Sequence, residues 1–163
     1  CNASSCASHE VQRSQARALS PLRPGGIVFY PQFFYLLHEV QEDFLAHIGF
    51  PENEMIAGGA GVPIVDLKTE FLGMCRHGDL LTITLELTRI GGASLGMRYE
   101  ILGEPATPGA AAPVRLRAHG VVVYSEVPNG KPLRIPDALR EALLPYLQTS
   151  PGADPHDQKT ATP

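Results

Sequence analysis

A pair of glycines, Gly25 and Gly26, stands a few residues before Pro31, where a strongly apolar helical pattern begins. Glycine lets a backbone approach a ligand closely, and the first N–H groups of a helix have no partner within the helix. These groups, with the helix dipole behind them, can stabilise the negative oxygen that develops when a carbonyl carbon is attacked. The pattern is compatible with a site for acyl-transfer chemistry, but these residues alone favour a tight turn before a water-capped helix.

Few side chains near this segment could act as the base in such a reaction. Arg23 lies just before the glycines, but a guanidinium has no lone pair to accept a proton and stays charged. His38 and Glu39 lie about 12 Å along the helix axis from Tyr30. That distance is far for a base at the helix start but would allow contact with an acyl group, and a purely structural role for His38 is the favoured interpretation.

The helix that positions these groups is predicted by apolar residues at helical spacing from Pro31 to Ile48, ending before Gly49. Proline in the first turn and glycine after the last turn are typical helix boundaries. The apolar stripe is too wide for an ordinary surface helix, so we expect other parts of the chain to wrap it.

Alternating apolar and polar residues predict strands after this helix. The strands are expected over 62–71, 81–88, 97–101 and 114–124. Gly91 and Gly92 would form the turn of an antiparallel hairpin, and the last strand is expected to bulge at Gly120. With a short helix over 136–147, the pattern predicts an α+β fold in which an antiparallel sheet curls around the long helix.

Composition limits the classes of protein to which the chain can belong. With 163 residues, 44% of them hydrophobic, and a net charge of −4, it is expected to form one globular domain. No cluster of Lys and Arg favours nucleic acid, and no apolar run is long enough to cross a membrane. The three cysteines, Cys1, Cys6 and Cys75, lack CxxC spacing, so we predict no metal site and a cytoplasmic location.

The folded body is predicted over residues 24–148. Residues 1–23 are rich in Ser, Ala, Arg and Gln without apolar periodicity, which predicts a poorly ordered segment. Residues 149–163 contain prolines and no large apolar side chain, which predicts a disordered tail.

Three segments together resemble one known family. They are Gly26-Ile27-Val28-Phe29-Tyr30-Pro31-Gln32-Phe33-Phe34, Gly61-Val62-Pro63-Ile64-Val65 and Gly78-Asp79-Leu80-Leu81-Thr82-Ile83. In order and spacing they are similar to the hotdog-fold acyl-CoA thioesterases of the 4-hydroxybenzoyl-CoA thioesterase type. The resemblance implies a sheet wrapped around a central helix, a homodimer or homotetramer, and hydrolysis of an acyl-CoA substrate without a cofactor.

The resemblance also implies roles for individual residues. The backbone N–H of Tyr30 would bind the oxyanion, with Gly26 beside it, and Arg23 occupies the position of the family's catalytic Asp. The positions implied to bind substrate are Val28, Phe33, Leu37, His38, Val62, Pro63 and Ser94.

Arginine at position 23 departs from the family pattern, and three explanations are open. The chain binds acyl-CoA without hydrolysing it, it uses another base, or the residues before Pro24 are read one nucleotide out of frame. Under such a shift, Arg17 to Pro24 can be read as Val-Arg-Phe-x-His-Cys-Asp-Pro, which places Asp at position 23.

We predict an acyl-CoA thioesterase for aromatic or short- to medium-chain acyl groups, with the acyl group in a pocket beside the helix and CoA at a subunit interface. The alternative is a non-catalytic acyl-CoA binding or regulatory module. A hotdog dehydratase is disfavoured, because no His and acidic pair can be placed for it. Arg115 and Arg117 are expected on the outer face of a strand, and contact with CoA phosphates is their less favoured role.

Overall fold

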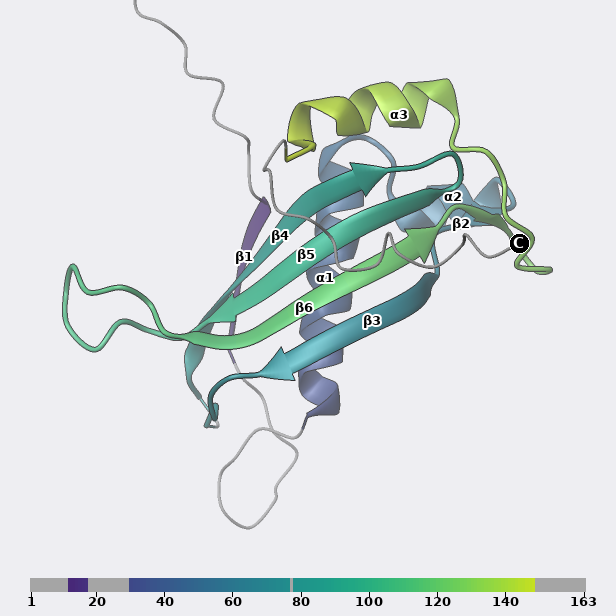
Figure 1. Cartoon of the computed structure of the whole chain (residues 1–163). Helices are drawn as coiled ribbons and strands as arrows, with labels where there is room; N and C mark the ends of the chain where they lie inside the picture. The colour runs from purple at the N-terminus through teal and green to yellow at the C-terminus, as the bar shows by residue number, and fades with distance from the viewer. Residues whose placement is uncertain (1–11, 18–29, 77, 149–163) are drawn as a thin grey trace, which may run out of the picture.

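The computed structural model describes residues 12–17, 30–76 and 78–148, the first of these ranges by its backbone alone. The elements in chain order are β1 (Gln12–Arg17), α1 (Pro31–His47), α2 (Glu52–Ala57), β2 (Ala60–Gly61), β3 (Ile64–Phe71), β4 (Leu80–Ile90), β5 (Ser94–Leu102), β6 (Val114–Val123), β7 (Ser125–Glu126), α3 (Asp137–Leu143) and a 3₁₀ turn (Leu144–Tyr146). Five strands form an antiparallel sheet in the order β1-β4-β5-β6-β3, and α1 lies against one face of it (Figure 1). The predicted α+β arrangement is confirmed.

Helix α1 begins and ends as the sequence predicts. Pro31 is its first residue, and Gly49 adopts a φ of 89°, a left-handed conformation that suits glycine. The N–H of Gly49 donates to the Ala46 carbonyl, and that of Phe50 donates to the Leu45 carbonyl, so the last turn is satisfied. The residues buried on α1 are Phe33, Leu36, Leu37, Val40, Gln41, Phe44 and Leu45.

The helix is covered less completely than its apolar stripe predicts. Within the described residues, Phe34 remains 37% exposed and Tyr35 66% exposed. The sheet covers one face of α1, and the buried side chains of β4, β5 and β6 pack against that face. In the part of the chain that the structure describes, the side of α1 that carries Phe34 and Tyr35 is partly exposed.

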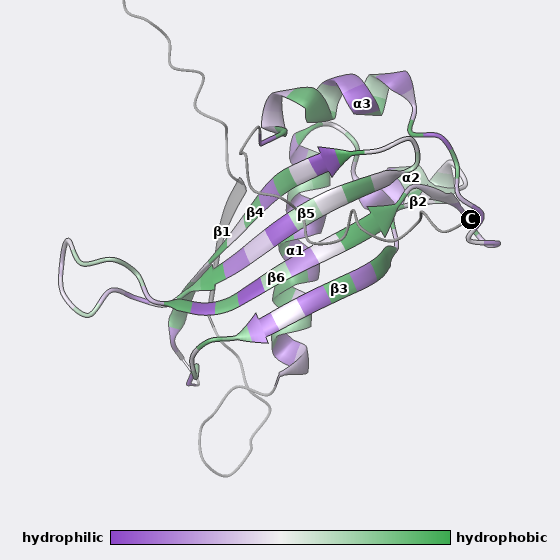
Figure 2. Ribbon diagram, viewed as in Figure 1, coloured by the Kyte–Doolittle hydropathy of each residue, from purple (hydrophilic) through white to green (hydrophobic). Residues whose placement is uncertain are grey.

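The sheet itself follows the expected alternation, which Figure 2 shows as bands of hydrophobic and hydrophilic residues along the strands. The buried row consists of Leu81, Ile83, Leu85 and Leu87 on β4, Leu95, Met97, Tyr99 and Ile101 on β5, and Leu116, Ala118 and Val122 on β6. These side chains and the inner face of α1 form a single core. Burial of such side chains contributes roughly 1.5–3 kcal/mol each.

The bulge expected at Gly120 is wrong. Strands β5 and β6 stay in register through this residue, which pairs with Met97. The shift lies on β3, between Ile64 and Asp66. Gly120 instead belongs to the buried row, where an added Cβ would come within 3.3 Å of the Ile64 and Tyr99 side chains. Glycine is needed there for space, and the sequence pattern alone could not distinguish this need from a bulge.

Several short elements were not expected: β1, α2 and the paired strands β2 and β7. Part of the segment predicted to be poorly ordered, Gln12–Arg17, forms β1 and pairs antiparallel with β4. An open sheet edge offers hydrogen bonds to any backbone, so this pairing needs no apolar period. Helix α2 was also missed, and the strand expected over 62–71 begins at Ile64, after β2 has paired with β7. The predicted tail over 149–163 lies outside the described residues.

Contacts from later in the chain hold the turn between β4 and β5. The N–H of Tyr124 donates to the Ala93 carbonyl at 2.7 Å, and that of Ile135 donates to the Gly92 carbonyl at 2.9 Å. Arg140 of α3 donates from Nη2 to the Gly91 carbonyl at 2.6 Å. The turn is therefore fixed by residues that follow it by about 30 to 50 positions.

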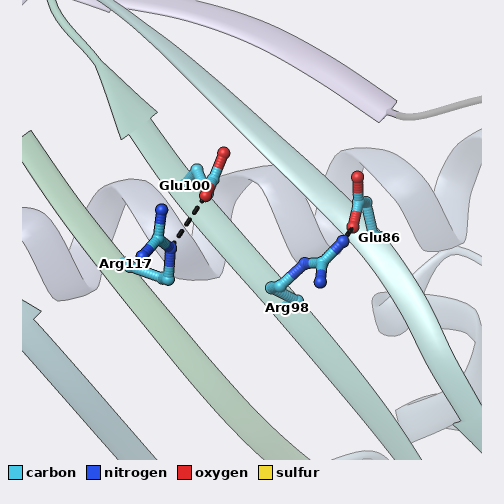
Figure 3. A network of polar contacts seen from close by, with 4 residues as sticks. All are labelled: Glu86, Arg98, Glu100 and Arg117. Atoms are coloured by element: carbon cyan, nitrogen blue, oxygen red, sulfur yellow. Dashed lines mark hydrogen bonds and ion pairs between the residues drawn. The ribbon is translucent and has the colours of Figure 1, made fainter. Parts of the chain in front are cut away.

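The face of the sheet away from α1 carries ion pairs between neighbouring strands (Figure 3). Arg98 pairs with Glu86, and Arg117 pairs with Glu100 at 2.9 Å between Nε and Oε1. Partly exposed pairs of this kind contribute about 0–1 kcal/mol each. Arg117 lies on the outer face as expected, and its charge is engaged by Glu100. None of the helices in the described ranges is long and apolar enough to span a membrane.

Candidate active site

A pocket of about 210 Å³ lies between α1, α2 and the start of β3. Its lining residues are Phe34, Leu37, His38, Gln41, Glu52, Val62, Pro63, Ile64, Leu67 and Tyr99. Most of these side chains are apolar, and the polar ones come from both helices and from β5. An apolar hollow with few polar groups is the usual form of a small-molecule site.

The structure brings together four of the residues predicted to bind substrate. Leu37 and His38 approach from α1, and Val62 and Pro63 approach from the segment between β2 and β3. These two segments are far apart in sequence, so only the fold makes them neighbours. These four residues line one pocket, and their contact with substrate remains a prediction.

Other predicted residues lie elsewhere. Ser94 stands at the start of β5, where its Oγ accepts a hydrogen bond from Arg89 Nη2 at 3.3 Å, and it does not line the pocket. Phe33 is buried and lies beside a second hollow near the start of α1. Arg23, Gly26 and Val28 lie outside the described residues.

The second hollow, of about 320 Å³, contains the start of α1. It is lined by Tyr30, Phe33, Phe71, Leu72, Gly73, Met74 and Cys75. Tyr30 is the N-cap residue of α1, so the positive end of the helix dipole faces this region. Burial raises the pKa of the Cys75 thiol, which disfavours the thiolate.

A cluster of titratable side chains stands beside the first pocket. His38 Nε2 lies 3.4 Å from Glu42 Oε1, one turn further along α1, and Glu52 approaches from the first turn of α2. One ligand-type atom from each residue lies within 4.8 Å of the other two, a spacing that a metal ion could bridge. His38 and Glu42 are exposed, and such spacing is common without a metal, so our prediction of no metal site is unchanged.

Glu52 is more buried than its neighbours His38 and Glu42. Burial raises the pKa of its carboxyl group, the nearby Glu42 adds to the rise, and His38 opposes it. Within the described residues, Oε2 of Glu52 is buried without a hydrogen-bond partner. The pocket therefore contains a carboxyl group that holds its proton more tightly than usual.

Sequence reasoning missed three polar residues of the pocket: Gln41, Glu52 and Tyr99. A signal existed for two of them. Gln41 follows Val40 on the apolar face of α1, and Tyr99 lies in the buried row of β5, where a hydroxyl needs a partner. Glu52 gave no such signal, because α2 was not predicted.

Comparison with known proteins places the chain among thioesterases. The family model of the thioesterase superfamily matches residues 25–109, just over half of the chain. A 1,4-dihydroxy-2-naphthoyl-CoA hydrolase from Synechocystis sp. is 25% identical over 120 residues, which cover 72% of this chain and 83% of the relative. The chain therefore belongs to the thioesterase superfamily.

Solved structures agree with the architecture. The 1,4-dihydroxy-2-naphthoyl-CoA thioesterase from Synechocystis has a TM-score of 0.70 at 21% identity, over 83% of this chain and 96% of that one. The 4-hydroxybenzoyl-CoA thioesterase from Pseudomonas sp. strain CBS-3 has a TM-score of 0.69 at 22% identity, over 81% and 98% of the two chains. The predicted hotdog fold is confirmed.

Proposed function

We propose that the chain is an acyl-CoA thioesterase that hydrolyses aromatic or short- to medium-chain acyl-CoA thioesters to a free acid and CoA, with a rate impaired by Arg23 at the position of the family's catalytic Asp. Membership of the thioesterase superfamily supports the reaction class. The observation that carries the substrate class is the apolar pocket beside α1, which suits an acyl group and is too small for the rest of CoA. Relatives named for naphthoyl-CoA and benzoyl-CoA substrates support an aromatic acyl group.

In this proposal the thioester carbonyl lies at the start of α1 and the acyl group extends along the helix into the pocket. The helix dipole stabilises the oxyanion, and the backbone N–H of Tyr30 is the predicted donor. His38 lies about 12 Å from Tyr30 along the axis, so within one chain it contacts the acyl group rather than the carbonyl. CoA is a substrate here, and the reaction consumes water without a separate cofactor.

A non-catalytic acyl-CoA binding module is the second candidate, and Arg23 favours it. An arginine there leaves the helix end able to bind a carbonyl oxygen while nothing at that position activates water. Release of CoA thiol from benzoyl-CoA, a naphthoyl-CoA and octanoyl-CoA tests both candidates, together with binding of their non-hydrolysable thioether analogues. Hydrolysis by the chain or by its Arg23→Asp variant supports the enzyme, binding without hydrolysis by either supports the module, and absence of both overturns the acyl-CoA assignment.

We also propose that the chain forms a homodimer or homotetramer, in the cytoplasm, with β3 as an interface strand. Strand β3 is an edge of the sheet, and within the described residues no strand pairs with its outer side. Large apolar side chains are exposed along it and beside it: Phe34, Tyr35, Ile64, Val65, Phe71, Leu72 and Met74. An exposed apolar edge of this kind favours association with a second copy.

A further inference from the structure

Gln41 is a buried amide in an otherwise apolar row. It is 5% exposed and lies on the inner face of α1, between the sheet and the first pocket, which it lines. A buried amide is costly unless its hydrogen-bonding groups find partners. Its partners therefore show what the pocket is built to hold.

Tyr99 fixes the carbonyl end of this amide. The Tyr99 hydroxyl donates to Gln41 Oε1 at 3.0 Å and also lies 3.2 Å from Met97 Sδ. A thioether sulfur is a weaker acceptor than an amide oxygen, so the single hydroxyl proton goes to Gln41. Burial raises the pKa of Tyr99, which keeps the hydroxyl protonated and able to donate. The carbonyl of Gln41 thus faces Tyr99.

The amide nitrogen of Gln41 is consequently directed away from Tyr99. Within the described part of the chain, the Nε2 atom of Gln41 makes no hydrogen bond, whereas its Oε1 atom accepts one from Tyr99. This nitrogen is not among the buried polar atoms that are sealed from solvent without a partner. Because Gln41 lines the pocket, the unused N–H groups face into it.

The position of this donor along the pocket is also defined. Phe34 and Gln41 both line the pocket and are seven residues apart on α1, which is about 10 Å along the axis. Phe34 lies one turn from the helix start, where the thioester is proposed to bind. Gln41 therefore stands at the end of the pocket that is remote from the thioester.

We propose that Gln41 is a specificity-determining residue, whose amide nitrogen donates a hydrogen bond to an oxygen on the distal part of the acyl group. The preferred substrates are then acyl-CoA thioesters whose acyl group carries a hydroxyl or keto oxygen at the end remote from the thioester. The inference rests on the proposed function, because it assumes that an acyl group occupies this pocket.

Binding of matched probes tests the inference independently of catalysis. The probes are two non-hydrolysable thioethers, S-(2-naphthylmethyl)-CoA and its 6-hydroxy analogue, and calorimetry measures their dissociation constants. We expect the full chain to bind the hydroxylated probe about three- to tenfold more tightly, as one net hydrogen bond provides. In Gln41→Met the two probes should bind equally, with affinity for the plain probe retained.

Two further variants sharpen the comparison. Gln32→Met makes the same exchange on the same helix outside the pocket lining, so the preference for the hydroxylated probe should persist. Tyr99→Phe frees the amide to rotate and should reduce the preference, which provides a second readout if Gln41→Met does not fold. Equal binding of both probes to the unmodified chain, or a preference that survives Gln41→Met, overturns the inference while acyl-CoA binding stands. Failure of both probes to bind overturns the proposed function instead.

Discussion

Arg23 occupies the position at which the resemblance requires a carboxylate, and its side chain cannot replace one. With Arg23 at this position, we expect the chain to hydrolyse benzoyl-CoA and short acyl-CoAs barely faster than buffer. Arg23→Asp should raise the rate by about a hundred- to ten-thousandfold, the usual contribution of such a group. Replacing residues 17–23 by Val-Arg-Phe-x-His-Cys-Asp should raise it further by rebuilding the segment that holds the loop.

The assay is release of free CoA thiol, with Arg134→Asp, an exchange at an exposed arginine of the C-terminal segment, as the control. Full activity in the unmodified chain would contradict the need for this carboxylate. If neither variant gains activity, the binding module is the better interpretation.

His38 lines the pocket from an exposed position on α1, so its replacement should change selectivity without unfolding the chain. We expect His38→Leu to shift kcat/KM between polar and apolar acyl groups by several-fold toward the apolar ones. The melting temperature should stay within about 2 °C of the unmodified value. Glu39→Leu, a neighbour that does not line the pocket, is the control. An unchanged substrate profile would return His38 to a structural role.

Glu52 should make stability depend on pH. Because burial raises its pKa in the folded state, the folded chain holds this proton more tightly than the unfolded chain does. Stability is therefore lost as the pH rises through the interval above the ordinary pKa of a glutamate. Glu52→Gln should raise the melting temperature at pH 7, by up to about 2 °C, and change it little at pH 4.

Thermal unfolding followed by circular dichroism at both pH values measures this effect. The exposed Glu54 is on the same helix, and Glu54→Gln should not reproduce it. A rise of equal size at both pH values would contradict an origin in ionisation.

At the scale of elements, Gly120 shows how β6 shapes the pocket. An added Cβ would lie 3.3 to 3.5 Å from the side chains of Ile64, Leu67 and Tyr99, all of which line the pocket. Gly120→Ala should therefore push them inward, with a net cost of about 1 kcal/mol from overpacking. Affinity for bulky acyl groups should fall more than affinity for short ones.

Denaturant unfolding and competition between short and bulky thioether probes measure the two effects. Gly92→Ala is the matched control, because an added Cβ there meets nothing within 4 Å. A uniform loss of affinity for all probes would contradict the steric origin.

The elements that the sequence predicts are those with a long, regular apolar period. Helix α1 and the β4–β5 hairpin fall in this class, because many residues repeat the same signal. Strand β1 and helix α2 do not fall in this class, since each has six residues and lacks a regular apolar period of its own. Both depend on contacts with neighbouring elements. The register shift between β3 and β6 lies on β3, between Ile64 and Asp66, and the apolar alternation within β6 does not reveal it.

The site was predictable to the extent that it follows single segments. Val62 and Pro63 belong to a motif that can be recognised in the sequence, and Leu37 and His38 follow another such motif on the same helix. The contact between Gln41 and Tyr99 joins residues 58 positions apart, so no local pattern contains it. A polar residue within an apolar row is the sequence signal that indicates such a contact.

For the whole molecule, the exposed apolar edge at β3 predicts association. Light scattering at micromolar concentration should show a dimer or tetramer. Val65 is 60% exposed on this edge, and Val65→Lys should shift the assembly toward monomer, because a charge there opposes strand pairing. Glu141→Lys changes an exposed residue of α3, which contacts β4, a strand that β5 and β6 separate from β3. This variant should leave the assembly unchanged. A stable monomer in the unmodified chain would contradict the interface.

The contacts that fix the turn between β4 and β5 can form only late during synthesis of the chain. The carbonyl groups of Gly91 and Gly92 in this turn accept hydrogen bonds from Arg140 and Ile135, which leave the ribosome later. Domains fold as their residues emerge, and α1 and the hairpin emerge first. The nascent chain can therefore assemble the helix-on-sheet core early, while the tip of the hairpin stays accessible to chaperones and proteases until α3 arrives to close it.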